Sequence, residues 1–239
     1  MVFWILFGGL ILATLINWYA AFFERRKRFA ATKPSVMILL ISIFLYLGGL
    51  ERLTIWFFLA LIFSLAGDIF LLFSKRFFLY GLFVFLCAQI SYLIGFNSSF
   101  PPLVPSVIGL GLAFIFPLLF YFQLKHEVQT KNHVKRLLPG ILIYVFTLSA
   151  MTISAGLDVF KPAWNPLAAW TTFVGGFLFL CSDLMLAIDR FIKRFKLAHG
   201  LVMVTYHLAQ FALVLGVLLQ YRILSREITI LTFIRPLIK

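Results

Sequence analysis

Long runs of apolar residues follow one another along most of the chain, and short polar stretches separate them. A helix needs about 20 mostly apolar residues to cross the ~30 Å hydrocarbon layer of a bilayer, and its backbone must be hydrogen-bonded within the segment. The pattern therefore predicts an all-α, polytopic transmembrane helix bundle of about eight spans. We place the spans at residues 2–23, 34–50, 53–73, 77–97, 103–123, 137–155, 167–188 and 199–221.

The connections between these runs are short, which predicts one bundle over residues 1–222 and a basic C-terminal tail over 223–239. Pro34 and Pro139 each follow a basic cluster and are expected to open the second and sixth spans. Similar segments recur four spans apart, which suggests a parallel four-plus-four repeat.

Composition agrees with a membrane protein, because 63% of the residues are hydrophobic and only 12% are charged, against about 25% in soluble domains. The formal net charge of +13 could suit nucleic acid, but 15 of the 21 Lys and Arg residues lie in the odd-numbered connections. This asymmetry is the positive-inside signal, which places those connections in the cytoplasm and both termini outside. The four basic residues of the C-terminal segment oppose that rule. The expected partners are thus membrane lipids, with no nucleic acid, and the compact connections favour a bacterial inner membrane.

Two aspartates stand inside apolar runs. Asp68 lies in "SLAGDIFLLF" and Asp183 in "FLFLCSDLMLAIDRF", and each precedes the next basic residue by seven positions. The two acids are therefore expected at matching depth, in the cytoplasmic halves of the third and seventh spans. An acid near a helix centre costs roughly 2.5–3.5 kcal/mol on insertion, so the pair indicates either a working site or hydrogen-bonded helix contacts. In contrast, we expect Asp158 in a loop and Asp189 in a surface ion pair with Arg190.

Other polar residues could face the same cavity, although a satisfied interhelical hydrogen bond is the commoner role for any one of them. The candidates for binding a substrate are Lys33, Ser64, Gln89, Tyr92, Ser182, Tyr206, His207 and Gln210. Lys33, Lys75, Arg76 and Arg190 lie at one membrane edge, where they could hold a phosphate or simply fix topology. No cluster has the spacing of a metal site, so neither a metal nor a cofactor is expected.

Four segments carry a resemblance in order and spacing: "KPSVMILL" at 33–40, "SLAGDIFLL" at 64–72, "GGFLFLCSDLMLAIDRF" at 175–191 and "TYHLAQ" at 205–210. Together they resemble the YhhN-like membrane proteins, the lysoplasmalogenase family. The resemblance implies hydrolysis of the vinyl ether bond of a lysophospholipid substrate, a lysoplasmalogen, to a fatty aldehyde and glycerophospho-ethanolamine or -choline. It places the family's acids on Asp68 and Asp183 and its Lys-Pro motif on Lys33 and Pro34. Where it implies a histidine in span four, this chain has Gln89.

Vinyl ether hydrolysis suits two buried carboxyl groups. Protonation of the β-carbon gives an oxocarbenium ion that water captures, which needs one protonated acid and one carboxylate; neighbouring buried acids tend to share a proton. The residues alone leave open which aspartate is the acid. They also leave open a proton-coupled transporter that uses the same pair as a relay, and a structural or lipid-binding protein without turnover.

Overall fold

The computed structural model describes residues 1–50, 54–73, 77–98 and 101–221, and within these residues the regular structure is helical. Eight helices are long and apolar enough to cross a membrane, which confirms the predicted fold class. They are α1 (Val2–Phe22), α2 (Arg26–Tyr46), α3 (Ile55–Leu72), α4 (Phe78–Phe96), α5 (Leu103–Thr130), α6 (Asn132–Leu157), α7 (Pro166–Ala187) and α8 (Ala198–Gln220). Two short segments follow α6 and α7, a 3₁₀ turn η2 (Asp158–Phe160) and a π-helical turn η3 (Ile188–Ile192).

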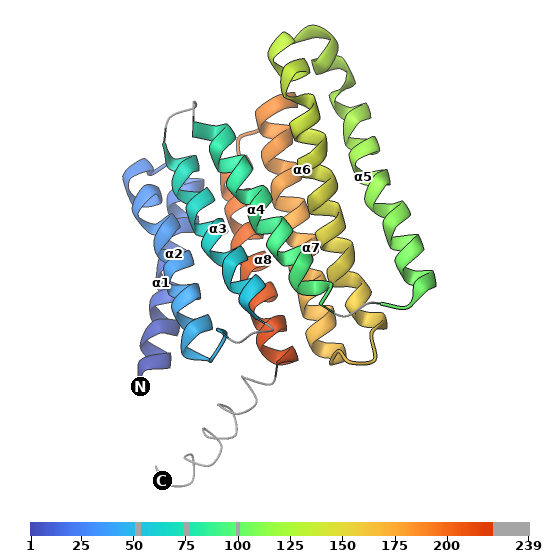
Figure 1. Ribbon diagram of the computed structural model, residues 1–239. Helices are drawn as coiled ribbons and strands as arrows, with labels where there is room; N and C mark the ends of the chain where they lie inside the picture. The colour runs from blue at the N-terminus through green and yellow to red at the C-terminus, as the bar shows by residue number, and fades with distance from the viewer. Residues whose placement is uncertain (51–53, 74–76, 99–100, 222–239) are drawn as a thin grey trace.

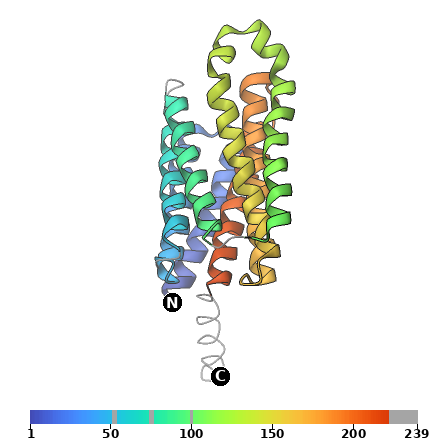
Figure 2. The same cartoon turned by 45° about the vertical axis from the view of Figure 1, so that its right-hand side comes forward.

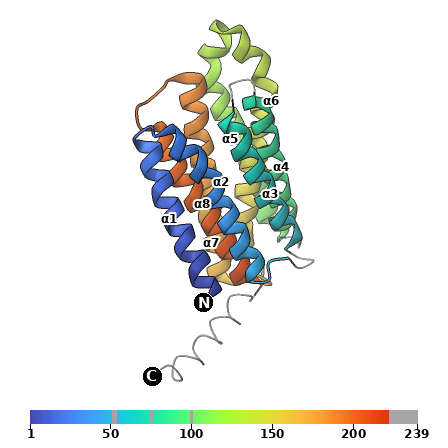
Figure 3. The same ribbon diagram turned by 90° about the vertical axis from the view of Figure 1, so that its left-hand side faces the viewer.

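Neighbours in sequence pack as antiparallel pairs, α1 with α2, α3 with α4, α5 with α6 and α7 with α8 (Figure 1). The bundle is long and narrow when it is viewed from the side (Figure 2). Helix α8 packs against α7, α1 and α2, and Figure 3 shows the face where α1 and α2 lie in front. Helix α5 packs mainly on α6 and lies at one edge of the bundle. The predicted tail 223–239 lies outside the described residues.

Two helices begin earlier than the apolar pattern predicts. Helix α2 begins at Arg26 and α6 at Asn132, so Pro34 and Pro139 lie inside helices and the prediction that they open spans is wrong. The physical reason is packing, because the added turn of α2 buries Phe29 against His199 of α8, with ring centroids 4.3 Å apart. Burial of one face can hold a polar turn in a helix even where hydropathy is low.

The connection after α6 holds an unexpected buried ion pair. Asp158, which the sequence analysis places in a loop, is fully buried, and its Oδ1 lies 2.7 Å from Nζ of Lys161. The same ammonium group donates a 2.6 Å hydrogen bond to the carbonyl oxygen of Phe96, at the end of α4. This clamp ties the α6–α7 connection to α4 at the end of the bundle opposite the α5–α6 connection.

Glycines bring α7 and α8 into close contact. A Cβ atom on Gly216 would lie 2.9 Å from the carbonyl oxygen of Ala168, and one on Gly175 would lie 2.8 Å from the backbone nitrogen of Leu213. Both obstacles are backbone atoms that cannot turn aside. Small residues of this kind let transmembrane helices approach closely where no hydrophobic force drives them together.

We expect Gly216→Ala to lower the melting temperature of the detergent-solubilised protein, because overpacking costs about 1–3 kcal/mol. The matched control is Gly111→Ala on α5, where a Cβ meets nothing within 4 Å. Thermal unfolding followed by tryptophan fluorescence compares the two variants. Equal melting temperatures would show that the α7–α8 contact tolerates the added methyl group.

Candidate functional site

The two membrane aspartates line one pocket. Asp68 lies near the end of α3 and Asp183 near the end of α7, and both contribute to a cavity with about 370 Å³ of empty space. The helices α2, α4, α6 and α8 complete the lining with Lys33, Phe78, Leu82, Phe85, Tyr144, Val202, Met203 and Tyr206, together with Leu71, Ser182 and Leu186. The two carboxylates lie near enough for their charges to interact. Residues far apart in sequence thus meet at one site.

Asp68 is fully buried and has both oxygens engaged. Its Oδ1 lies 3.0 Å from Nζ of Lys33, and its Oδ2 accepts a 2.9 Å hydrogen bond from the hydroxyl of Tyr206. Lys33 itself is only 3% exposed, so it lies inside the bundle and not on its surface. The reason is the early start of α2, which carries Lys33 two turns into the helix. A buried ion pair needs good geometry and further hydrogen bonds to offset the cost of desolvation, and Tyr206 supplies one.

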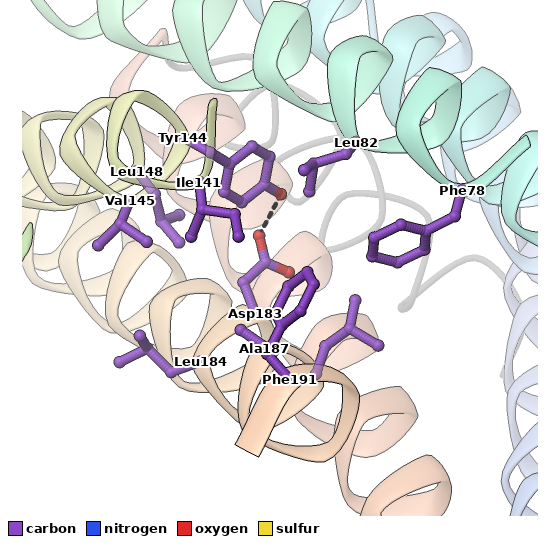
Figure 4. Close-up of a pocket in the computed structure, with 11 residues that line it drawn as sticks. Phe78, Leu82, Ile141, Tyr144, Val145, Leu148, Asp183, Leu184, Ala187 and Phe191 are labelled. Atoms are coloured by element: carbon purple, nitrogen blue, oxygen red, sulfur yellow. Dashed lines mark hydrogen bonds between the residues drawn. The ribbon is translucent and has the colours of Figure 1, made fainter. Parts of the chain in front are cut away.

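Asp183 has a different environment. Its Oδ2 accepts hydrogen bonds from the hydroxyl of Tyr144, at 2.5 Å, and from Nε2 of Gln89, at 3.3 Å. Figure 4 shows the tyrosine reaching this carboxylate from α6. The side chain is half-buried, and among the described residues no Lys, Arg or His nitrogen lies within 4 Å of it. Both donors are therefore neutral, and Oδ1 remains free of protein donors within the described part of the chain.

A second, more apolar pocket adjoins the first. It shares Asp183 and Tyr144 with its neighbour, and side chains of hydrocarbon make up most of its lining. Its wall comes from α4, α6, α7 and η3: Phe78, Leu82, Ile141, Val145, Leu148, Leu184, Leu186, Ala187 and Phe191 (Figure 4). Several of these side chains are half-exposed, so the pocket reaches the flank of the bundle. One carboxylate is the main polar group of an otherwise hydrocarbon-like wall.

Five of the predicted site residues stand behind these pockets rather than in their linings. Tyr92 donates a 2.7 Å hydrogen bond to Gln210, whose amide donates in turn to Ser64 at 3.0 Å. His207 accepts a 3.1 Å hydrogen bond at Nδ1 from the indole of Trp18 on α1, and Gln89 reaches Asp183 as described. All five are fully or almost fully buried. Ser182 does line the first pocket, and it donates to the carbonyl oxygen of Val202 at 3.0 Å.

The remaining charged residues take other places. Asp189 forms no ion pair with Arg190, contrary to the prediction. Its Oδ1 instead accepts a 3.2 Å hydrogen bond from the backbone nitrogen of Phe195, while Arg190 lies over the ring of Phe78. Lys75 and Arg76 lie outside the described residues. Within the described part of the chain, no three His, Cys, Asp or Glu side chains gather as a metal site needs. Tyr144 is the site residue that the sequence analysis missed, since a single tyrosine in an apolar run carries no signal of its own.

The fold and the site define a class, a polytopic membrane protein with a two-carboxylate pocket inside the bundle. The chain belongs to the YhhN family, whose model matches residues 28–217, and this range contains every residue of both pockets.

Two relatives carry names that describe an activity. The chain is 29% identical over 182 residues to a lysoplasmalogenase homolog of Dictyostelium discoideum, covering 64% of this chain and 60% of the relative. It is 28% identical over 162 residues to lysoplasmalogenase TMEM86A of Bos taurus, covering 66% of this chain and 63% of the relative. The chain thus spans less than two thirds of the length of these relatives. No solved structure matches.

Removal of the Lys33 charge is expected to destabilise the protein strongly. Lys33→Met leaves Asp68 buried without its cation, and breaking a buried pair costs about 3–5 kcal/mol. The double variant Lys33→Met/Asp68→Asn removes both charges and should recover most of the loss. Melting temperatures of the wild type, both single variants and the double variant form a complete cycle. A double variant no more stable than Lys33→Met would contradict the ion-pair explanation.

Proposed function

We propose that this protein is an integral membrane hydrolase that cleaves the vinyl ether bond of lysoplasmalogens, releasing a fatty aldehyde and a glycerophospho-ethanolamine or -choline. The observation that carries the proposal is the meeting of Asp68 and Asp183 at one pocket, beside a second pocket whose lining is mainly apolar. The names of the two relatives support the same reaction and the lysophospholipid substrate.

The two carboxyl groups take unequal roles in this mechanism. The Lys33 ammonium offsets the charge of Asp68, so one proton on Asp183 makes the group of three neutral, the least costly state away from water. Because Tyr144 and Gln89 both donate to Oδ2 of Asp183, the proton sits on Oδ1. Asp183 is thus the general acid, and Asp68 remains a carboxylate.

Proton transfer from Oδ1 of Asp183 to the β-carbon breaks the carbon–carbon π bond and leaves an oxocarbenium ion. At that moment the site holds two carboxylates against one ammonium, and its net negative charge balances the positive charge of the substrate. Water then attacks the oxocarbenium carbon and returns a proton to Asp183. The resulting hemiacetal separates into the aldehyde and the glycerol alcohol, so one water is consumed and the acid is restored. Positioned proton transfer of this kind contributes about 10²- to 10⁴-fold.

The apolar pocket gives the alkenyl chain its place. With the chain along the wall that α4, α6 and α7 form, the ether end meets Asp183, which lies between the two pockets. Half-exposed residues at the pocket allow a lipid to enter from the bilayer flank rather than through water. We keep the bacterial inner membrane as the proposed location, on the short connections, although the two named relatives are eukaryotic.

The transporter alternative predicts helices broken near the membrane centre. Helices α3 and α7, which carry the aspartates, are continuous α-helices through Asp68 and Asp183, and the irregular turn η3 begins only at Ile188. The geometry therefore favours the hydrolase.

We expect Asp183→Asn and Asp68→Asn each to lower aldehyde release from a lysoplasmalogen by at least about 10²-fold, since each removes a carboxyl group from proton transfer or charge balance. Glu24→Gln, an acid-to-amide change at an exposed position, is the control. Purified variants in mixed micelles are assayed for aldehyde, with size-exclusion profiles to show intact folding. Full activity in both aspartate variants would remove the mechanism.

Carbon protonation also leaves an isotopic record. In D₂O, the fatty aldehyde should carry a single deuterium on the carbon next to the aldehyde group, which mass spectrometry detects. Aldehyde incubated in D₂O without enzyme corrects for exchange. Product without deuterium above that background would exclude protonation at carbon as the first step.

A further inference from the structure

Arg190 lies against Phe78, a residue that lines both pockets. It lies on η3, directly after α7, and its guanidinium carbon is 4.6 Å from the centroid of the Phe78 ring. Phe78 lines both the first and the second pocket, while the Arg190 side chain is exposed. A cation over an aromatic face is held in place without the use of its N–H groups. The arginine is therefore positioned beside the site with its hydrogen-bonding edge available.

No carboxylate occupies that edge within the described residues, since Asp189 is turned to the backbone of Phe195. A guanidinium presents five N–H donors in a planar fork that matches phosphate oxygens. Lys33, the buried cation of the site, is committed to Asp68. Two of the predicted phosphate ligands, Lys33 and Arg190, lie among the described residues. Of these two, Arg190 is the one that is free to bind an anion.

The position also fits the length of the substrate. Arg190 follows Asp183 by seven residues, about 10 Å along a helix axis, and helical side chains lean toward the N-terminus, which is the direction of Asp183. The π turn that carries it is a further sign, because single π turns occur often at functional sites. In a lysoplasmalogen the phosphate and the vinyl ether are joined through one glycerol unit, so the two groups can reach Arg190 and Asp183 together.

We propose that Arg190 binds the phosphodiester group of the substrate and so selects ether lipids that carry a phosphate head. This inference rests on the proposed function for its substrate, while its binding chemistry can be tested without turnover. Phe78 acts as the positioning residue that holds the guanidinium beside the pockets.

The test compares substrates with and without the phosphate. Arg190→Gln should raise the KM for a lysoplasmalogen roughly tenfold or more, the loss expected from a charge-assisted hydrogen bond, and leave hydrolysis of the corresponding alkenylglycerol unchanged. Arg190→Lys keeps the positive charge but loses the planar fork of N–H donors, so its KM for the lysoplasmalogen should lie between those of the wild type and Arg190→Gln. Arg194→Gln, the same charge change at another exposed position of this connection, is the matched control.

A merely structural arginine would give a different result. Equal losses on both substrates, no change on either, or an equal effect of Arg194→Gln would each overturn the inference. Binding of the saturated alkyl ether analogues, with and without the phosphate, gives the same comparison without hydrolysis. The two proposals can also fail separately. If the wild type hydrolyses neither substrate but prefers the phosphate-bearing analogue in binding, and Arg190→Gln loses that preference, the hydrolase is refuted and the anion site stands.

Discussion

The burial of charge in an apolar bundle is the constraint on which the site depends. Lys33 and Asp68 are both almost completely removed from solvent, and each offsets the cost of burying the charge of the other. Their pairing fixes α2 against α3, and the hydroxyl of Tyr206 ties α8 to the same carboxylate. The wall of the pocket that α2, α3 and α8 form is thus held together by the ion pair and its hydrogen bond as well as by packing.

The other wall of the pocket, around Asp183, has no charged partner among the described residues. Asp183 is held by a tyrosine and an amide, both neutral, and it opens toward a surface of leucine, isoleucine and phenylalanine side chains. Two carboxyl groups of the same kind therefore occupy chemically unlike environments a short distance apart. Such a difference between paired acids is how proteins commonly separate an acid from a carboxylate. Gln89 keeps a donor to Asp183 at the place where the family resemblance implied a histidine.

Sequence reasoning reached the eight helices because hydropathy over about 20 residues is a strong signal. It failed at the start of α2 and α6, where tertiary burial of residues such as Phe29 extends a helix through polar residues that hydropathy assigns to water. The two aspartates stood out because an acid in an apolar run is costly. Tyr144 did not, since a tyrosine can face lipid, core or site equally well, and only the packing of α6 beside α7 shows which. The buried state of Asp158 was missed for the converse reason, because a connection rich in turn residues ordinarily lies in water.

The clamp of Asp158 and Lys161 gives the two ends of the bundle different responses to ionic strength. Mobile ions screen exposed charges beyond about 10 Å at 0.1 M salt, but they cannot enter between groups that have no contact with solvent. Salt will therefore weaken any attraction between an anionic bilayer surface and the exposed residues Arg25, Arg26 and Arg28. At the other end, the buried pair of Asp158 and Lys161 will hold α4 and the α6–α7 connection together in dilute and concentrated salt alike.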